Sequence, residues 1–335
     1  MKSFFATISK YLALAGALFY KKRLLNIIFI LYSCLTRKNK ILGLPFFLQV
    51  EPTNRCNLNC RLCLTGYEKL NRPKRDMAFD EFAKIIDQLE GSVFYLVLYN
   101  LGEPLLNNQI YQMISYAKKK RIFVRLHTNG DFKDKKHIES IINCGVDELT
   151  VSLDCATPQA YLKHKKSDTF ENVIDNIVSI IRERGRRYRP FINVQLLLTR
   201  DNENEISRFK SLVGRLKADK GLIKKVRVDF PGVQPDAAFL PLDTRYIRKI
   251  YKDGYRKKRC FRPWVSTVVL CDNSVTPCCF DMQAEHKFGS MDNSDFRQIW
   301  GSRGYAEFRQ QALSDINKIP LCRQCSAIDF FDNFL

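Results

Sequence analysis

The sequence predicts an α/β protein: a partial (β/α)6 barrel followed by a small cysteine-rich domain. Short β-rich apolar runs alternate with longer helical patterns from Phe46 onward, and this rhythm indicates a parallel sheet with crossover helices. Six such units are too few for a closed eight-stranded barrel. The residue composition changes after Phe230. Prolines and a glycine form a connector there, before the cysteines of the last third begin. This change predicts the second domain.

The expected strands lie at 46–51, 94–100, 123–128, 148–153, 191–198 and 226–230. The expected helices lie at about 80–90, 108–119, 134–143, 170–184 and 202–218. We therefore divide the chain into an N-terminal segment at 1–45, a barrel at 46–232, a linker at 233–258 and a C-terminal domain at 259–335.

The N-terminal segment is basic and apolar. Residues 1–48 contain no acidic residue and carry +8 of the formal net charge of +20. Its apolar stretches, Tyr11 to Tyr20 and Leu24 to Leu35, are each shorter than the ~20 residues that span a bilayer. No small-residue cleavage site follows them. Two interpretations stay open for residues 1–40: basic amphipathic helices on the inner membrane surface, or a helical lid packed on the domain's own core.

Two further basic runs lie at 182–189 and 245–262. Such runs could contact nucleic acid, anionic lipid or a phosphorylated substrate, or form a solvated face. A solvated basic face is at least as good an interpretation for both runs. We therefore expect no nucleic-acid partner.

Nine of the twelve cysteines lie in three tight groups, at 56–63, 260–279 and 322–325. A chain of 335 residues buries a sizeable core without cross-links, so stability does not require disulfides. Grouping at metal-ligand spacing instead predicts metal binding in a reducing, cytoplasmic compartment. The isolated Cys34, Cys144 and Cys155 are interpreted as small buried hydrophobic residues.

The first group, Cys56, Cys60 and Cys63, directly follows the first expected strand. Pro52 and three asparagines surround it, and these residues favour a turn over a helix. Structural zinc prefers four ligands, and no fourth cysteine or histidine is near. Three thiolates in one loop therefore favour an iron–sulfur cluster that keeps one iron open.

This Cys-x3-Cys-x2-Cys pattern after a first strand resembles the signature of the radical SAM superfamily. The resemblance implies a partial TIM-like barrel and a [4Fe–4S] cluster whose open iron binds S-adenosylmethionine. Reductive cleavage would give a 5′-deoxyadenosyl radical, which abstracts hydrogen from a substrate. One departure is Leu62, where many members have an aromatic residue beside the adenine.

Further positions match the family's cofactor-binding motifs in order. The segment Asn100-Leu-Gly-Glu-Pro resembles its Gly-Gly-Glu-Pro motif, and Gly102, Glu103 and Pro104 carry over. Ser152 and Asp154 end the fourth strand, where the family contacts cofactor and substrate, and Lys165 stands where an arginine often meets the cofactor carboxylate. Gln195 and Asn202 are weaker candidates. No side chain is assigned as the catalytic residue.

The C-terminal cysteines resemble a SPASM domain of the abbreviated, single-cluster "Twitch" type. This resemblance implies an auxiliary [4Fe–4S] cluster with the ligands Cys260, Cys278, Cys322 and Cys325, and Cys279 is the alternative to Cys278. A zinc knuckle with the same four thiolates stays open as an alternative.

The leading functional expectation is a radical oxidoreductase acting on a small molecule: a sugar, an aminocyclitol or a lipid-linked glycoside. The expected partners are the small-molecule substrate, with a phosphorylated or a lipid-linked compound as the options, and a reductase such as flavodoxin or ferredoxin. One alternative is a peptide-modifying maturase, but residues 1–45 are too short and too apolar for the peptide-docking module such enzymes carry. The other is a redox scaffold that holds clusters without turnover. We expect a cytoplasmic location, with peripheral contact to the inner membrane through residues 1–40.

Overall fold

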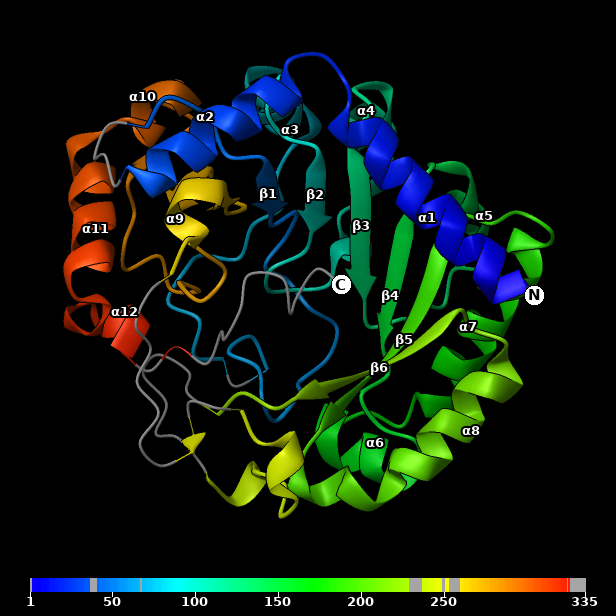
Figure 1. The fold of residues 1–335 in the computed structure, drawn as a ribbon. Coiled ribbons are helices and arrows are strands. Elements are labelled where there is room, and N and C mark those ends of the chain that lie inside the picture. The colour runs from blue at the N-terminus through cyan, green and yellow to red at the C-terminus, as the bar shows by residue number, and fades with distance from the viewer. Residues whose placement is uncertain are drawn as a thin grey trace.

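A nine-stranded sheet forms the centre of the molecule, with the order β6-β5-β4-β3-β2-β1-β7-β8-β9 (Figure 1). The computed structural model describes residues 2–36, 41–66, 68–228, 237–248, 251–252, 260–323 and 325. Strands from β6 to β7 pair in parallel, which confirms the α/β architecture with a parallel barrel sheet. The barrel strands are β1 (Phe47–Val50), β2 (Tyr95–Leu98), β3 (Phe123–Thr128), β4 (Glu148–Ser152), β5 (Phe191–Leu198) and β6 (Lys220–Lys225).

The sixth strand differs from the prediction, because β6 spans Lys220–Lys225 and not 226–230. β6 pairs with β5 at the edge of the sheet, and its residues are exposed or half-buried. An edge strand of this kind does not need a continuous apolar run. The apolar pattern that suggested a strand belongs to Val226 and Val228, which are buried beside Phe239 after β6 has ended. The last two residues of the predicted strand lie outside the described part.

Helices cover the outer face of the barrel strands, and their apolar stripes form the main core. Helix α3 is an example, because Phe82, Ile85, Ile86 and Leu89 recur at helical spacing and are all fully buried. The covering helices are α3 (Phe79–Leu89), α4 (Ile110–Lys119), α5 (Lys136–Asn143), α6 (Pro158–Lys165), α7 (Phe170–Arg184) and α8 (Ile206–Leu216). All but α6 were expected; α6 has few apolar residues and three basic ones in its last turn, so its periodicity is weak.

Aromatic side chains close the barrel at the amino ends of its strands. Phe47, Tyr95 and Phe123 begin β1, β2 and β3, and their rings stack at centroid distances of 4.9 and 5.1 Å. Ala17 of helix α1 (Lys2–Leu18) packs against this layer. Since the amino ends of the strands are sealed, the open end of the barrel is at their carboxyl ends.

Helix α2 (Arg23–Leu35) and α1 are anchored to the barrel by buried cations. Lys10 lies 3.2 Å from Glu148, at the start of β4. Arg23 is fully buried and donates hydrogen bonds to the carbonyl oxygens of Ala17 and Arg121 at 2.7 and 2.8 Å. One face of the two helices therefore packs on the domain, as the lid interpretation predicted. None of the described helices has the length and apolarity needed to cross a bilayer.

The C-terminal segment continues the barrel sheet on its β1 side. Strand β7 pairs in parallel with β1, and β8 and β9 follow as antiparallel strands. The elements are α9 (Arg262–Val265), β7 (Ser266–Val269), β8 (Ser274–Thr276), β9 (Gly289–Ser290), α10 (Phe296–Trp300), α11 (Arg303–Ser314) and α12 (Pro320–Arg323). Cys260 precedes β7 and Cys278 follows the antiparallel β8, so both cysteines lie toward the amino end of β7.

Candidate functional site

The loop after β1 carries the first three cysteines and is pinned by its own polar side chains. The Asn54 side chain donates to the Pro73 carbonyl at 2.7 Å and accepts the Arg75 N–H at 2.8 Å. The Thr53 hydroxyl donates to the Asp76 carboxylate at 2.6 Å. The asparagine and threonine that disfavour a helix here therefore fix a defined loop.

A buried ion pair holds this loop against two other segments. Arg72 makes two hydrogen bonds of 2.8 Å to the Glu51 carboxylate, and the two side chains are 6% and 0% exposed. The same carboxylate accepts the backbone N–H groups of Leu101 and Cys271, at 3.2 and 3.3 Å. Glu51 thus joins the cysteine loop, the loop after β2 and the C-terminal segment.

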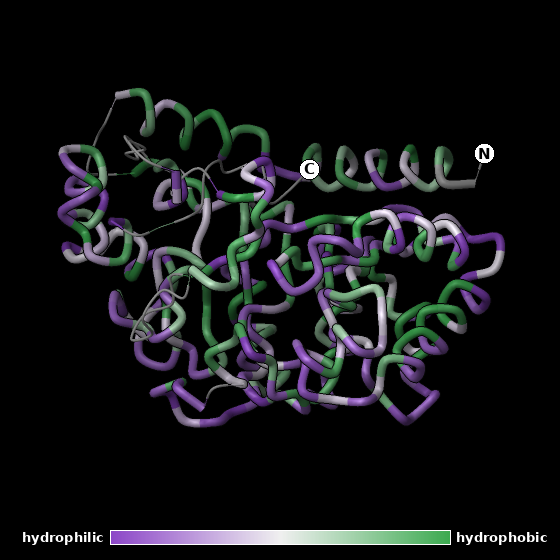
Figure 2. Tube along the Cα trace, turned by 90° about the horizontal axis from the view of Figure 1, so that it is seen from below, coloured by the Kyte–Doolittle hydropathy of each residue, from purple (hydrophilic) through white to green (hydrophobic). Residues whose placement is uncertain are grey.

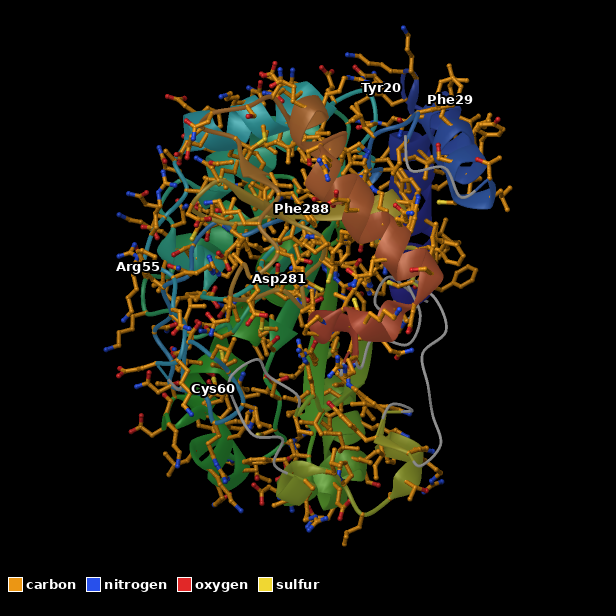
Figure 3. All side chains as sticks on the ribbon, turned by 90° about the vertical axis from the view of Figure 1, so that its left-hand side faces the viewer. Tyr20, Phe29, Arg55, Cys60, Asp281 and Phe288 are labelled. Atoms are coloured by element: carbon orange, nitrogen blue, oxygen red, sulfur yellow. The ribbon has the colours of Figure 1, made fainter. Side chains whose placement is uncertain are left out.

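Cys56, Cys60 and Cys63 line one cavity of about 280 Å³ at the carboxyl ends of the strands. Figure 3 shows Cys60 on the opposite side of the molecule from Tyr20 and Phe29 of the N-terminal segment. Burial raises the pKa of Cys56 to about 12 and that of Cys60 to about 11. Because thiolates are the metal-binding form, metal binding by these thiols would release protons.

Gly102 brings the loop after β2 into direct contact with the cysteine loop. Its φ is +75°, and an added Cβ would lie 2.5 Å from the Thr53 oxygen and 2.7 Å from the Arg55 oxygen. Only glycine fits both the backbone conformation and this close approach. The next residue, Glu103, then donates its N–H to the Arg55 oxygen at 2.7 Å.

The Glu103 carboxylate is oriented at the wall of the same cavity. It accepts the Thr128 hydroxyl at 2.8 Å and the Asn129 N–H at 2.7 Å, both from the end of β3. Burial raises its pKa, and these hydrogen bonds oppose the rise. Pro104 follows and opens a short 3-10 turn, Pro104–Leu106. Gly102, Glu103 and Pro104 therefore all line the first cavity.

Ser152, Asp154 and Lys165 line the opposite wall. The Lys165 ammonium lies 2.6 Å from Asp154, and both side chains are buried. Burial favours the neutral carboxyl, but the Lys165 charge outweighs it and the pKa of Asp154 lies below its ordinary value. Gln195 donates to Asp154 at 3.0 Å, and Asn202 donates to the Asp154 backbone oxygen at 3.0 Å. All five predicted residues of this wall thus form one network.

A second cavity, of about 180 Å³, adjoins the first inside the barrel. Tyr99, His127 and Lys224 line both cavities. The rings of Tyr99 and His127 stack with a centroid distance of 3.9 Å, and burial holds the pKa of His127 well below its ordinary value. Sequence reasoning missed these three residues. Alternation along β2 and β3 was the available signal for Tyr99 and His127, whereas Lys224 lies on the strand that was misplaced.

Four C-terminal cysteines line a third cavity, and these are the four predicted ligands Cys260, Cys278, Cys322 and Cys325. Cys279 instead lines the second cavity, next to the barrel interior. Cys271, which was not assigned as a ligand, is fully buried, and its sulfur lies 3.9 Å from Arg72. The geometry therefore separates Cys278 and Cys279 onto two sides of one turn.

A separate group of possible metal ligands follows Cys279 in the chain. Zinc binds thiolates at about 2.3 Å, so its ligand sulfurs lie within about 4 Å of one another. Among the described residues, three such ligand atoms within 4.8 Å of one another occur at Asp281, Glu285 and His286, a group without cysteine. Asp281 there accepts the N–H groups of the other two at 2.9 Å, which is a turn.

Comparison with known proteins agrees with this chemistry. The family model of the radical SAM superfamily matches residues 50–213, and that of the SPASM iron–sulfur cluster-binding domain matches residues 260–326. The chain is 23% identical over 320 residues to the tungsten-containing aldehyde ferredoxin oxidoreductase cofactor-modifying protein of Pyrococcus furiosus. That match covers 85% of this chain and 88% of the relative.

Solved structures share the fold. Streptococcus suis SuiB bound to S-adenosylmethionine superposes with a TM-score of 0.68 at 14% identity, covering 90% of this chain and 76% of SuiB. BtrN in complex with S-adenosylmethionine and 2-DOIA superposes with a TM-score of 0.53 at 17% identity, covering 85% of this chain and 94% of BtrN. At these identities the likeness extends to the fold alone.

Proposed function

Because this chain belongs to the radical SAM superfamily and carries a SPASM domain, we propose that it oxidises a small molecule: a sugar, an aminocyclitol or a lipid-linked glycoside. Membership implies a [4Fe–4S] cluster that binds S-adenosylmethionine, and an auxiliary cluster. When bound, these groups supply a 5′-deoxyadenosyl radical for hydrogen abstraction and an acceptor for the electron left on the substrate. A one-electron donor such as flavodoxin or ferredoxin completes the proposed reaction.

The adjoining cavities are the observation that carries this proposal. The first holds Cys56, Cys60 and Cys63, and the second reaches Cys279, next to the C-terminal cysteine group. A substrate in the second cavity would lie between the two cluster sites, which suits hydrogen abstraction on one side and electron removal on the other. The volume of about 180 Å³ is below the ~300–1,000 Å³ of common ligand pockets, so it favours a small metabolite over a peptide.

The proposed ligand assignments follow the cavity walls. Cys56, Cys60 and Cys63 would hold the first cluster, and Cys260, Cys278, Cys322 and Cys325 the second. Glu103 would accept the amino group of S-adenosylmethionine, because Thr128 and Asn129 hold its carboxylate at the wall of the first cavity. Lys165 would contribute positive charge for the cofactor carboxylate while Asp154 fixes its position.

Anaerobic turnover tests the proposal. The protein is reconstituted with iron and sulfide, and S-adenosylmethionine and dithionite are added. We expect about eight irons per chain and formation of 5′-deoxyadenosine. A redox scaffold would hold iron but form no 5′-deoxyadenosine, and a zinc knuckle would reduce the iron to about four per chain. Either result would contradict the corresponding part of the proposal.

We propose that the enzyme binds peripherally to an anionic bilayer through the outer face of α1 and α2. In Figure 2 the two helices lie along one outer edge and are largely coloured as hydrophobic. Soluble monomers rarely expose apolar patches of this extent. Lys21 and Lys22 are exposed between the helices and suit anionic headgroups. The exposed side chains are Phe4, Phe5, Ile8, Tyr11, Leu12, Phe19, Leu24, Leu25, Ile28, Phe29, Leu31, Tyr32 and Leu35.

Vesicle sedimentation tests this contact. Deleting the helices would uncover the barrel floor, so we choose a variant with Leu24, Leu25, Ile28 and Leu31 all changed to serine. We expect the parent to sediment with phosphatidylglycerol vesicles but not with phosphatidylcholine alone, and the variant to stay in solution. Leu242→Ser, which changes a residue that is 70% exposed elsewhere, is the control. A variant that still sediments would contradict the proposed surface.

A further inference from the structure

The second cavity has a strongly cationic wall. Five of its described lining residues are basic, and none is an aspartate or glutamate. They come from distant parts of the chain and converge on one space of about 180 Å³. The basic lining residues are Arg125 of β3, Lys224 of β6, Arg227, Arg248 and Arg262.

Part of this charge is balanced within the protein. Arg125 lies 3.7 Å from Glu148, a carboxylate that it shares with Lys10. Arg262 faces the C-terminal cysteines, whose thiolate charge raises its pKa against the effect of burial. These two cations therefore have anionic neighbours even when the cavity holds no ligand.

Lys224 is not balanced in this way. Within the part of the chain that the structure describes, its ammonium makes no hydrogen bond or ion pair, and it is only half-buried because the cavity is its open side. Burial and the Arg125 and Arg248 guanidinium groups lower its pKa to about 8, although the Asp154 carboxylate and Cys279 partly oppose this shift. Placing lysine and arginine together without a lining carboxylate is costly unless a ligand supplies negative charge.

Contacts within the protein hold the other two arginines at the wall of the cavity. Arg248 donates to the backbone oxygens of Lys225 and Val226 at 2.8 to 3.0 Å, which fixes its position next to β6. The Arg227 guanidinium lies 4.2 Å from the centre of the Phe280 ring. An arginine fork binds two oxygens of one oxyanion, and several cations around one small space match the charge of a phosphate better than that of a carboxylate.

We propose that the substrate is a phosphate monoester or diester, an inference that rests on the proposed function above. Its phosphate is held in the second cavity by Lys224, Arg125, Arg227 and Arg248. The uncharged part then points toward Tyr99 and His127, where the second cavity meets the first. This selects phosphorylated members of the proposed substrate class and disfavours a free aminocyclitol, whose ammonium groups would be repelled by the same wall.

Calorimetry on the anaerobically reconstituted holoenzyme tests the charge requirement. The three ligands share a three-carbon skeleton and differ in charge: glycerol 3-phosphate, glycerate and glycerol. We expect saturable binding of glycerol 3-phosphate, weaker binding of glycerate and none of glycerol. Lys224→Met should weaken glycerol 3-phosphate binding by roughly 10- to 100-fold, the loss of one charge-assisted hydrogen bond. Lys224→Arg should recover most of it.

Lys220→Met is the matched control, because it removes the same charge from the exposed end of the same strand. Its affinity should stay within about twofold of the parent. Equal weakening by both variants, equal binding of glycerate and glycerol 3-phosphate, or no binding by the parent would overturn the phosphate site. Binding is measured without turnover, so a parent that binds phosphate but forms no 5′-deoxyadenosine would refute the proposed function and leave this site standing.

Discussion

Replacing Arg72 by methionine should destabilise the protein strongly, because it would leave the Glu51 carboxylate buried without its cation. The pair forms two hydrogen bonds of 2.8 Å, and Glu51 is fully buried. Breaking such a pair from one side costs about 3–5 kcal/mol of unfolding free energy. The same change should loosen the cysteine loop, since Glu51 also fixes Leu101 and Cys271.

Urea unfolding of the metal-free protein under argon, followed by circular dichroism, measures the loss. Arg55→Met is the control, because Arg55 pairs with Asp76 in the same loop but the two side chains are 47% and 34% exposed. That exposed pair should contribute less than about 1 kcal/mol. Replacing both Glu51 and Arg72, by glutamine and methionine, should recover part of the stability, because no unpaired charge stays buried. An Arg72→Met loss below about 1 kcal/mol, or an equal loss in Arg55→Met, would refute this reasoning.

Three further results are expected. Gly102→Ala should lower the yield of 5′-deoxyadenosine severalfold, because its Cβ would lie 2.5 Å from the Thr53 oxygen, whereas Gly16→Ala, with open space around it, should change nothing. Cys322→Ala should reduce iron from about eight to about four per chain and spare cofactor cleavage, while Cys279→Ala should keep both clusters; an equal iron loss in both variants would contradict the ligand assignment. Because the pKa of Lys224 is about 8, the affinity for glycerol 3-phosphate should not change with pH just below pH 8. Above pH 8 the amine becomes neutral, and the affinity should fall by up to about tenfold per pH unit. The phosphate itself titrates near pH 6, so a level profile up to about pH 9.5 would exclude Lys224 as a ligand.

Features that depend on residues close together in the chain could be predicted from the sequence. Cys56, Cys60 and Cys63 lie within one loop, and their turn-forming neighbours excluded a helix without any knowledge of the fold. Most of the parallel strands and most helices could also be predicted, because the buried strands are short apolar runs and each helix repeats its apolar residues at the helical period. The motif at Gly102 to Pro104 was identified by its resemblance to a family motif, and its position after the second strand predicted that it lies at the same edge of the sheet as the cysteine loop.

The tertiary structure alone decided which distant charges meet. Arg125, Lys224 and Arg248 are far apart in the sequence, and β6 carries no apolar run that could have located Lys224. Cys278 and Cys279 are adjacent and chemically identical, so only the direction of the turn assigns them to different cavities. The N-terminal helices likewise have one face on the barrel floor and one face exposed. Their amphipathic pattern predicts two such faces but does not say what each face contacts. Local patterns thus determined most of the elements and the cysteine loop, whereas the second cavity depends on side chains that only the folded barrel brings together.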